Sequence, residues 1–457
     1  MKTFNLYLFL IIITFSSICP ACNDQQINTK EKAEKIAIEQ YADSLFNSNV
    51  DSNIIAGASL ILFKKGKVLL NKKYGLSSIE LQTPMPENAL FEIGSVTKQF
   101  TSVAIMKLVE AGKLNLNDDF TKYVDFDTQG KRVTINNLLY HTSGIASYTN
   151  LPEFWELQKE DYEKDSIVKF IENAGFDFEP GQMMLYNNSG YFLLGLVIEK
   201  VSGKEYAEFL SRELFEPLGL KHTFYSSNKS IMKGKVYGYE SGEEGLIQRS
   251  YLSHSWPYAA GSLCSSTGDL LKWLQGLHEG KVLSKDSYLK YITPNELLNG
   301  EKTMYGMGIS NYMDNGYKVI GHGGAINGFV SETRFYQNED LYIICLINTF
   351  GEKGVDEFVD NLIWQLLEKK ETVYSARKKS LDQLVGDYTS IDKNGMVTIR
   401  VNEIEGDLLA GFDVMEEMDT LTYYIGNNCW EKGTEKYFFK EDTLFFSDPY
   451  GVYVLVK

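Results

Sequence analysis

Residues 91–100 read FEIGSVTKQF, and residues 101–110 continue as TSVAIMKLVE. Apolar residues recur at near-helical spacing after Val96, and a glycine at 112 supplies a stop, so the stretch predicts a buried helix with Ser95 in its first turn. A hydroxyl there lies beside unpaired backbone N–H groups, and Lys98 returns to the same helix face one turn later. Ser95 and Lys98 can therefore touch.

This pair has a chemical use. A desolvated lysine loses its proton readily and can deprotonate a neighbouring serine, which turns a weak hydroxyl into a nucleophile. Ser-x-x-Lys is a short pattern, however, and the alternative is an N-cap serine followed by a solvated lysine. Further polar clusters have to distinguish the two interpretations.

A second polar cluster occupies residues 179–191, which read EPGQMMLYNNSGY. A Pro-Gly turn and then polar residues precede the apolar stretch 192–198, so Tyr186 and Asn188 are predicted on a loop held by a buried helix. The alternative is a helix cap supplied by Asn188 or Ser189, and both interpretations stay open.

A third cluster, IGHGGAINGF at 320–329, lies between the strand-like segments 317–319 and 330–336. Glycine inside a strand pattern indicates that another group approaches the backbone closely. The backbone N–H groups near Gly323 and Gly324 are then free to face a ligand. A metal or phosphate site is less favoured, because neither a second histidine nor a lysine-bearing loop accompanies His322.

Three motifs in this order, Ser-x-x-Lys, Tyr-Asn-Asn and His-Gly-Gly, resemble the serine β-lactamase and penicillin-binding protein superfamily. The resemblance is to the branch of class C β-lactamases, D-alanyl-D-alanine carboxypeptidases and related esterases. The segment LYHTSG at 139–144 also fits, and the resemblance covers roughly residues 33 to 370. It implies an α+β fold in which helices flank an antiparallel sheet, with an additional all-helical subdomain.

The resemblance also implies roles for individual residues. Ser95 would be the nucleophile, Lys98 its activating partner and Tyr186 the phenolate or hydroxyl that shuttles protons. The implied substrate-binding residues are Asn188, His322, Gly323 and Gly324, and the backbone N–H groups of Ser95 and Ala325 would form an oxyanion hole. A helix N-terminus and a strand edge can both direct donors at one developing oxyanion.

His322 departs from the class C pattern, which has lysine in a Lys-Thr-Gly strand. Histidine carries only part of a positive charge near neutral pH, so we expect its titration to govern the binding of a substrate carboxylate. Efficient β-lactamase activity is thereby disfavoured relative to peptide or ester hydrolysis. His141 could be taken for a base, but the turn residues after it favour a structural hydrogen bond at a helix end.

The N-terminus predicts export. Residues 1–22 combine Lys2, an apolar run and a small residue before Cys22, which is typical of an export signal and resembles a lipoprotein signal with Cys22 as the lipidated residue. Plain secretory cleavage is the alternative. We expect a protein of the periplasm or cell envelope, with possible membrane attachment through Cys22.

The domain organisation follows from pattern changes along the 457 residues. After a polar tether at 23–32 we expect a hydrolase domain at 33–371, a charged linker at 372–383 and a small antiparallel β-barrel, similar to a lipocalin-like module, at 384–457. The cysteines and histidines form no ligand cluster, so neither metal nor cofactor is expected.

The predicted function is that of an exported serine hydrolase, which cleaves an amide or ester through an acyl-enzyme on Ser95. A small peptide, an ester or a β-lactam would be the substrate, and loops 149–175 and 226–253 would select it. The net charge of -16 argues against nucleic acid as a partner. The alternative is a catalytically silent protein that senses peptidoglycan fragments or another ligand.

Overall fold

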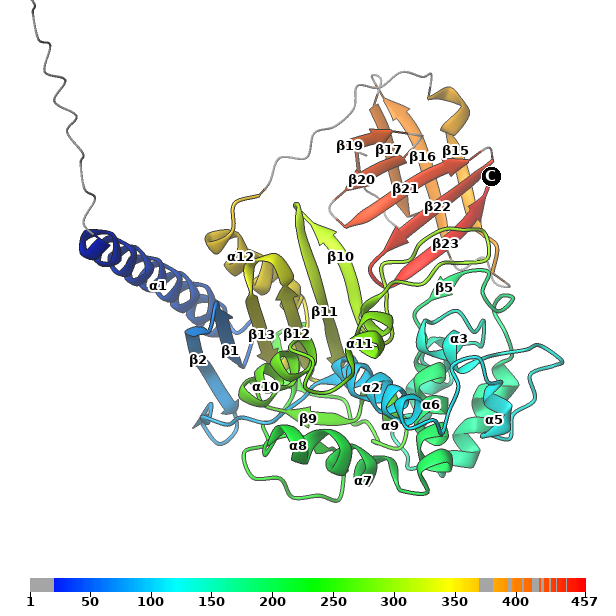
Figure 1. The fold of residues 1–457 in the computed structure, drawn as a ribbon, viewed down its shortest axis with the longest axis horizontal. Coiled ribbons are helices and arrows are strands. Elements are labelled where there is room, and N and C mark those ends of the chain that lie inside the picture. Colours follow the sequence, from blue (N-terminus) through cyan, green and yellow to red (C-terminus); the bar gives the residue numbers. More distant parts are fainter. Residues whose placement is uncertain are drawn as a thin grey trace, which may run out of the picture.

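The computed structural model describes residues 20–369 and, in the C-terminal region, 381–392, 397–404, 407–412, 419–420, 423–426, 429–432, 434–440 and 442–457. Most of the expected export signal and of the expected linker at 372–383 lies outside the described residues. Cys22 lies in the described backbone at the start of the first helix. A larger mixed body and a C-terminal sheet make up the fold (Figure 1).

A seven-stranded antiparallel sheet is the centre of the larger body, with strand order β10-β11-β12-β13-β1-β2-β3. The expected hairpin near residue 65 is confirmed as β1 and β2. The strands are β1 (Gly57–Lys64), β2 (Lys67–Ser78), β3 (Thr83–Pro84), β10 (Ser310–Asp314), β11 (Tyr317–Ile326), β12 (Phe329–Tyr336) and β13 (Leu341–Ile347). The His-Gly-Gly motif therefore lies on β11.

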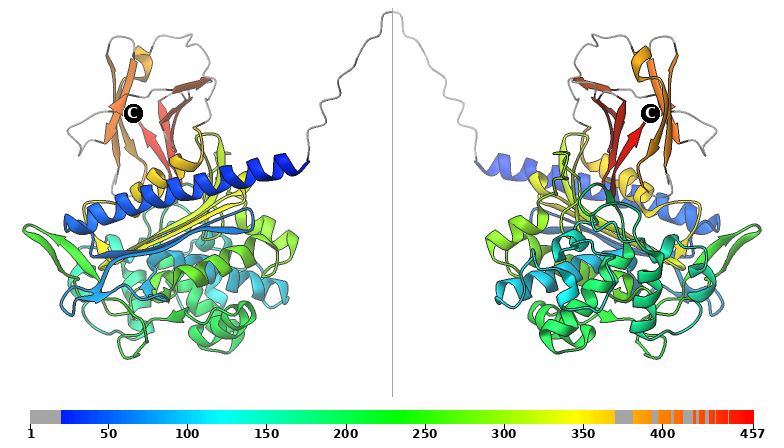
Figure 2. Two further views of the ribbon diagram at one scale, coloured as in Figure 1. Left: turned by 90° about the vertical axis from the view of Figure 1, so that its left-hand side faces the viewer. Right: turned by 90° about the vertical axis from the view of Figure 1, so that its right-hand side faces the viewer.

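Two helices cover one face of this sheet, α1 (Pro20–Asp51) and α12 (Val355–Leu366) (Figure 2). Their apolar stripes meet the sheet in one core, in which Phe46 stacks on Tyr74 and Phe358. The helix α1 also runs through 23–32, the expected tether. No glycine or proline follows Pro20 before the helix ends, so nothing in the sequence interrupts it.

The opposite face carries the helices that build the site, and their buried side chains form the largest core. They are α2 (Thr97–Glu110), α3 (Ile135–Leu139), α4 (Phe154–Leu157), α5 (Lys164–Ala174), α6 (Asn188–Ser202), α7 (Tyr206–Leu210), α8 (Glu216–Leu218), α9 (Tyr258–Gly261), α10 (Thr267–His278) and α11 (Lys285–Ile292). The helix α2 is buried almost all round, as its apolar sequence predicts.

Short strands tie the connecting loops together. One small sheet has the order β4-β9-β6, from Phe91–Glu92, Leu263–Ser265 and Phe224–Tyr225, and another has the order β14-β7-β8, from Thr349–Phe350, Tyr239–Gly242 and Gly245–Gln248. The sheet β4-β9-β6 holds the segment that leads into the turn with Ser95.

The C-terminal strands pair in the order β18-β17-β16-β15-β23-β22-β21-β20-β19. They are β15 (Gly386–Ser390), β16 (Thr398–Ile404), β17 (Asp407–Phe412), β18 (Asp419–Thr420), β19 (Tyr423–Gly426), β20 (Cys429–Lys432), β21 (Glu435–Lys440), β22 (Thr443–Asp448) and β23 (Gly451–Val456). This antiparallel half-barrel surrounds a core of its own. A short strand of the larger body, β5 (Met184–Leu185), pairs with β23.

The expected α+β fold with an appended antiparallel β region is thus confirmed. Within the described ranges, no helix combines the length and the apolar character needed to cross a lipid bilayer.

Candidate active site

Ser95 lies where the chain leaves β4 and enters a helical turn, Gly94–Val96, that leads into α2. Gly94 has a φ of +48°, and a Cβ there would lie 2.7 Å from the Ala325 carbonyl oxygen. Only glycine allows both this conformation and this close approach. The start of α2 is thereby pressed against β11, which puts the Ser95 hydroxyl beside the strand.

The entry to this turn is fixed by a buried carboxylate. Glu92 has almost no exposed surface, and its two oxygens lie 2.9 Å from Lys235 Nζ and 2.7 Å from Arg249 Nη1. Burial alone would raise the pKa of Glu92, but His254 and Arg249 hold it below its ordinary value. The carboxylate is therefore ionised and anchors two loops to β4.

Lys98 is fully buried on α2, directly below Ser95. Its Nζ lies 3.1 Å from Ser95 Oγ, 2.7 Å from Asn188 Oδ1 and 2.9 Å from the Ala260 carbonyl oxygen. None of the described residues forms a salt bridge with it. Burial lowers the pKa of Lys98 well below its ordinary value, which favours the neutral amine.

The three contacts fit a neutral amine. An uncharged –NH2 group has two donors and one lone pair; Asn188 Oδ1 and the Ala260 oxygen can only accept, so they take both donors. The lone pair is then left for the Ser95 hydroxyl. A lysine held in this way could remove a proton from a serine.

Tyr186 lies between β5 and α6, and its ring centroid is 4.7 Å from Lys98 Nζ. Its hydroxyl oxygen is buried and makes no regular hydrogen bond with any described residue. Burial raises the pKa of Tyr186 well above its ordinary value, and the adjacent Ser95 hydroxyl opposes that rise only in part. Of the two predicted forms, the neutral hydroxyl fits this site. An unpaired buried hydroxyl is costly unless a ligand pairs with it.

Neither Asn188 nor Ser189, the two residues predicted as alternatives for the helix cap, caps α6. Asn187 caps α6, because its Oδ1 accepts a hydrogen bond of 2.7 Å from Gly190 N–H. Asn188 Nδ2 donates to Thr149 Oγ1 at 3.1 Å, which turns the Oδ1 of Asn188 toward Lys98. The capping and the site functions therefore belong to neighbouring residues.

The strand β11 brings its glycines against the entry to α2. A Cβ at Gly324 would lie 2.2 Å from the Ile93 oxygen and 3.1 Å from Ser95 N. The close approach that the glycines predict is therefore confirmed. Ser95 and Ala325 line the same cavity, as the predicted oxyanion hole requires; binding of an oxyanion by their N–H groups stays a prediction.

His322 differs from the expectation. Its Nε2 lies 2.8 Å from Tyr305 Oη, and its Nδ1 donates to the Gly323 carbonyl oxygen. Burial lowers the pKa of His322 to about 3. The expectation that its titration near neutral pH holds a carboxylate is wrong, because the ring is desolvated and both nitrogens have protein partners. Direct contact with substrate stays a prediction.

His141 lies under the Tyr186 loop. It is buried, has a φ of +59°, and its Nδ1 accepts a hydrogen bond of 3.1 Å from Asn187 N–H. Its ring lies 4.6 Å from that of Tyr186. Burial lowers the pKa of His141, so the ring is neutral. This geometry agrees with the structural role favoured from the sequence.

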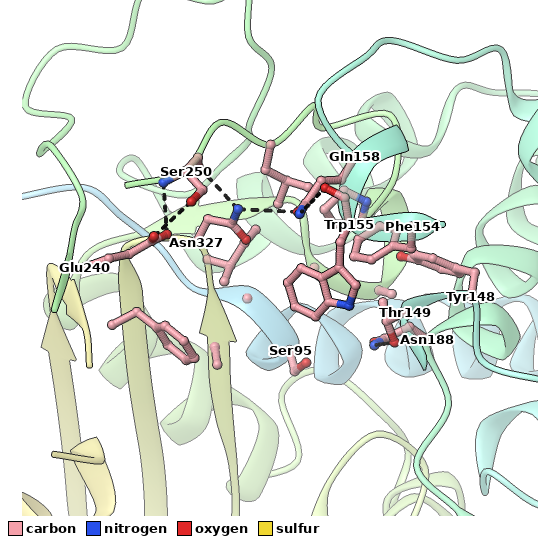
Figure 3. Close-up of a pocket in the computed structure, with 18 of the residues that line it drawn as sticks. Ser95, Tyr148, Thr149, Phe154, Trp155, Gln158, Asn188, Glu240, Ser250 and Asn327 are labelled. Carbon is pink, nitrogen blue, oxygen red and sulfur yellow. Dashed lines mark hydrogen bonds between the residues drawn. The ribbon is translucent and has the colours of Figure 1, made fainter. Parts of the chain in front are cut away.

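A cavity of about 670 Å³ opens above Ser95. Figure 3 shows Trp155 over the serine, with Asn188 at one side and Asn327 at the other. Asn327 Nδ2 lies 3.4 Å from Gln158 Oε1 and 3.2 Å from the Ser250 carbonyl oxygen. Asn327 thereby links two loops at the rim of the cavity. Residues of both loops that we expect to select the substrate, 149–175 and 226–253, line this cavity. Trp155 and Asn327 were not predicted individually, since no local pattern distinguishes a cavity residue within a loop.

The comparisons with known proteins agree with this geometry. A family model described as Beta-lactamase matches residues 42–368. Penicillin-binding protein 4* of Bacillus subtilis is 29% identical over 366 residues, which is 74% of this chain and 80% of that protein. Protein flp of Staphylococcus aureus strain MRSA252 is 27% identical, over 76% of this chain and 69% of that protein.

Two solved structures share the fold. The octameric penicillin-binding protein homologue from Pyrococcus abyssi superposes with a TM-score of 0.65 at 24% identity, over 92% of this chain and 99% of its own. D-amino acid amidase from Ochrobactrum anthropi, in a complex with L-phenylalanine amide, gives a TM-score of 0.65 at 23% identity, over 72% of this chain and 98% of its own.

Proposed function

The chain belongs to the Beta-lactamase family, and on that premise we propose that it hydrolyses an amide or ester through an acyl-enzyme on Ser95. The relatives support a serine hydrolase type of function.

The proposed reaction uses the contacts around Ser95. Neutral Lys98 accepts the Ser95 proton as Oγ attacks the carbonyl carbon, and the N–H groups of Ser95 and Ala325 stabilise the oxyanion. Tyr186, which keeps its proton at neutral pH, gives a proton to the departing amine or alcohol. Water then hydrolyses the acyl-enzyme by the reverse proton path.

One observation carries the proposal: a lysine with no exposed surface and no salt bridge to any described residue is hydrogen-bonded to a serine at the mouth of a cavity. Burying an amine without a counter-charge costs stability. Strongly perturbed groups of this kind concentrate at functional sites. A silent binding protein would have no chemical use for the arrangement.

The charges near the site bear on the substrate. A second cavity on the His322 side of Ser95 is lined by two basic residues, Arg334 and Lys369, and by six acidic ones: Asp314, Glu332, Asp356, Asp360, Glu435 and Asp448. With His322 neutral as well, this side favours a departing group without a carboxylate. We therefore favour neutral esters and amides over β-lactams and peptide carboxylates.

We also propose where the protein is located in the cell. The apolar run in residues 1–22 supports export to the periplasm or cell envelope, with Cys22 as the residue that could carry a lipid. Replacement of Cys22 by Ser should release the expressed protein from the membrane fraction if Cys22 is the anchor. A wild-type protein that is already free of membranes would contradict lipidation.

The test of function is hydrolysis by the wild type and by Ser95→Ala of neutral esters, primary amides, a penicillin and a peptide that ends in D-alanyl-D-alanine. We expect turnover of neutral esters or amides by the wild type and none by the variant. Ser95→Ala should fold normally, since a small side chain at a helix start contributes only about 1 kcal/mol. Equal turnover by both proteins would exclude Ser95 as the nucleophile.

A further inference from the structure

Tyr450 of the C-terminal sheet reaches the site. It lies at the turn between β22 and β23, and its Oη accepts a hydrogen bond of 3.2 Å from the N–H of Gly323 on β11. Its ring centroid is 5.8 Å from that of Tyr186 and 5.6 Å from that of His322. Figure 1 shows β22 and β23 descending toward β5 and β10.

Backbone pairing fixes this position. In β23, Gly451 pairs with Leu185 and Val452 with Met184, the two residues that precede Tyr186. On the other side, Ser310 Oγ donates to the Pro449 carbonyl oxygen at 3.3 Å. Tyr186 follows β5 and Tyr450 precedes β23, so the two tyrosines lie at the same end of this antiparallel pair. Tyr450 cannot move away without breaking those contacts.

Two cavities meet at Ser95 and Ala325. The first, with Trp155 above it, does not include Tyr186; the second, of about 870 Å³, is lined by Tyr186, Gly323 and Tyr450. The departing atom has to reach the proton of Tyr186. The leaving group therefore enters the second cavity, and the acyl group occupies the first.

The edge of β11 limits how a substrate can lie there. The strand β10 pairs with β11 only as far as Gly321, so the following residues of that edge have no strand beside them in the described structure. N–H groups of alternate residues point to the same edge, so those of Gly323 and Ala325 face the same way. The Tyr450 hydroxyl accepts the hydrogen bond of the Gly323 N–H and leaves the Ala325 N–H for a substrate.

We propose that Tyr450 determines leaving-group specificity. It blocks pairing of a substrate at Gly323 and narrows the second cavity beside Tyr186, so that leaving groups that are bulky next to the cleaved bond are disfavoured. The C-terminal region is then part of the active site. This inference rests on the proposed function, in which the Ser95 Oγ–carbon bond forms, the bond to the leaving group breaks, and Tyr186 supplies the proton that this group carries away.

The test uses three esters of one carboxylic acid, whose leaving groups are methanol, benzyl alcohol and glycolamide. All three give the same acyl-enzyme, so ratios of kcat/KM between them report only on the leaving-group side. The full-length chain is compared as wild type, Tyr450→Ala, Tyr450→Phe and Tyr237→Ala. Tyr237 is 57% exposed and does not line either cavity, so it serves as the matched control.

We expect the benzyl-to-methyl ratio to rise about tenfold or more in Tyr450→Ala and to stay unchanged in Tyr237→Ala. Tyr450→Phe keeps the ring but frees the Gly323 N–H, so it should improve only the glycolamide ester, which carries a carbonyl acceptor. This variant keeps the proposal testable if the alanine variant does not fold.

Wild-type turnover of the methyl ester through Ser95, with unchanged ratios in both Tyr450 variants, would overturn the role of Tyr450. Absence of turnover and of Ser95 acylation with all three esters would instead overturn the proposed function.

Discussion

Lys98 shows at the residue scale how function and stability are opposed in this protein. Its amine is desolvated and has no counter-charge among the described residues. We predict that Lys98→Met, which replaces the amine by an unbranched apolar side chain one atom shorter, abolishes turnover and raises the free energy of unfolding by about 1 to 2 kcal/mol at neutral pH. Thermal unfolding at constant pH measures this change.

The predicted increase in the free energy of unfolding follows from the linkage between protonation and folding. In the unfolded chain the Lys98 amine binds a proton up to its ordinary pKa of 10.5, whereas in the folded chain its pKa is lowered. Folding therefore works against protonation of Lys98 and lowers the stability of the folded wild type at pH values below 10.5. The advantage of Lys98→Met should therefore shrink as pH rises toward 10.5. A variant that is less stable than the wild type at all pH values would contradict a neutral buried lysine.

At the scale of elements, the start of α6 assigns different tasks to neighbouring asparagines. We predict that Asn187→Ala, which removes the cap bond to Gly190, costs about 1 kcal/mol of stability. Asn188→Ala should change stability less and reduce turnover more, since it releases Lys98. Unfolding and kinetics of the two variants, measured side by side, test the assignment; the reverse pattern would refute it.

The segment β4 depends on Glu92. Glu92→Gln leaves Lys235 and Arg249 without their carboxylate partner. We predict that it lowers the free energy of unfolding by about 3 to 5 kcal/mol. Glu87→Gln, which breaks an exposed pair with Lys73, is the control and should cost no more than about 1 kcal/mol.

The Glu92 contribution should depend on pH in a defined direction. Because its folded-state pKa is lowered, the contribution is complete above the ordinary value of 4.5 and is lost as pH falls through the lower folded-state value. The difference between wild type and Glu92→Gln should therefore narrow only in acid. A difference that is the same at all pH values would contradict an ionised Glu92.

These elements also mark what the sequence could predict. Local patterns placed Ser95 and Lys98 at the start of α2 and the glycine motif on β11, because helix periodicity and glycine spacing are local properties. The neutral state of His322 depends on its burial in the folded chain and could not be read from the motif. The contribution of Tyr450 depends on a strand pairing between distant segments.

At the scale of the whole molecule, the two bodies are joined where β5 meets β23. Val452 shares a small core with Met184 and Tyr305, directly beside the Tyr186 loop. We predict that Val452→Ala costs about 2 kcal/mol and also lowers kcat, because the loop loses its support. Val401→Ala, in the separate core of the C-terminal sheet, should lose similar stability without affecting kcat. Equal effects on kcat would mean that the junction only stabilises.

The most direct measurement of the central claim is the location of the acyl group. The wild type is mixed with an excess of a neutral ester, quenched in acid during turnover, digested and sequenced by tandem mass spectrometry. We predict one acyl group per chain, on the Ser95 oxygen, which forms only slowly in Lys98→Met. An acyl group on another residue, or turnover without any adduct on Ser95 under conditions that trap an acyl-enzyme, would contradict it.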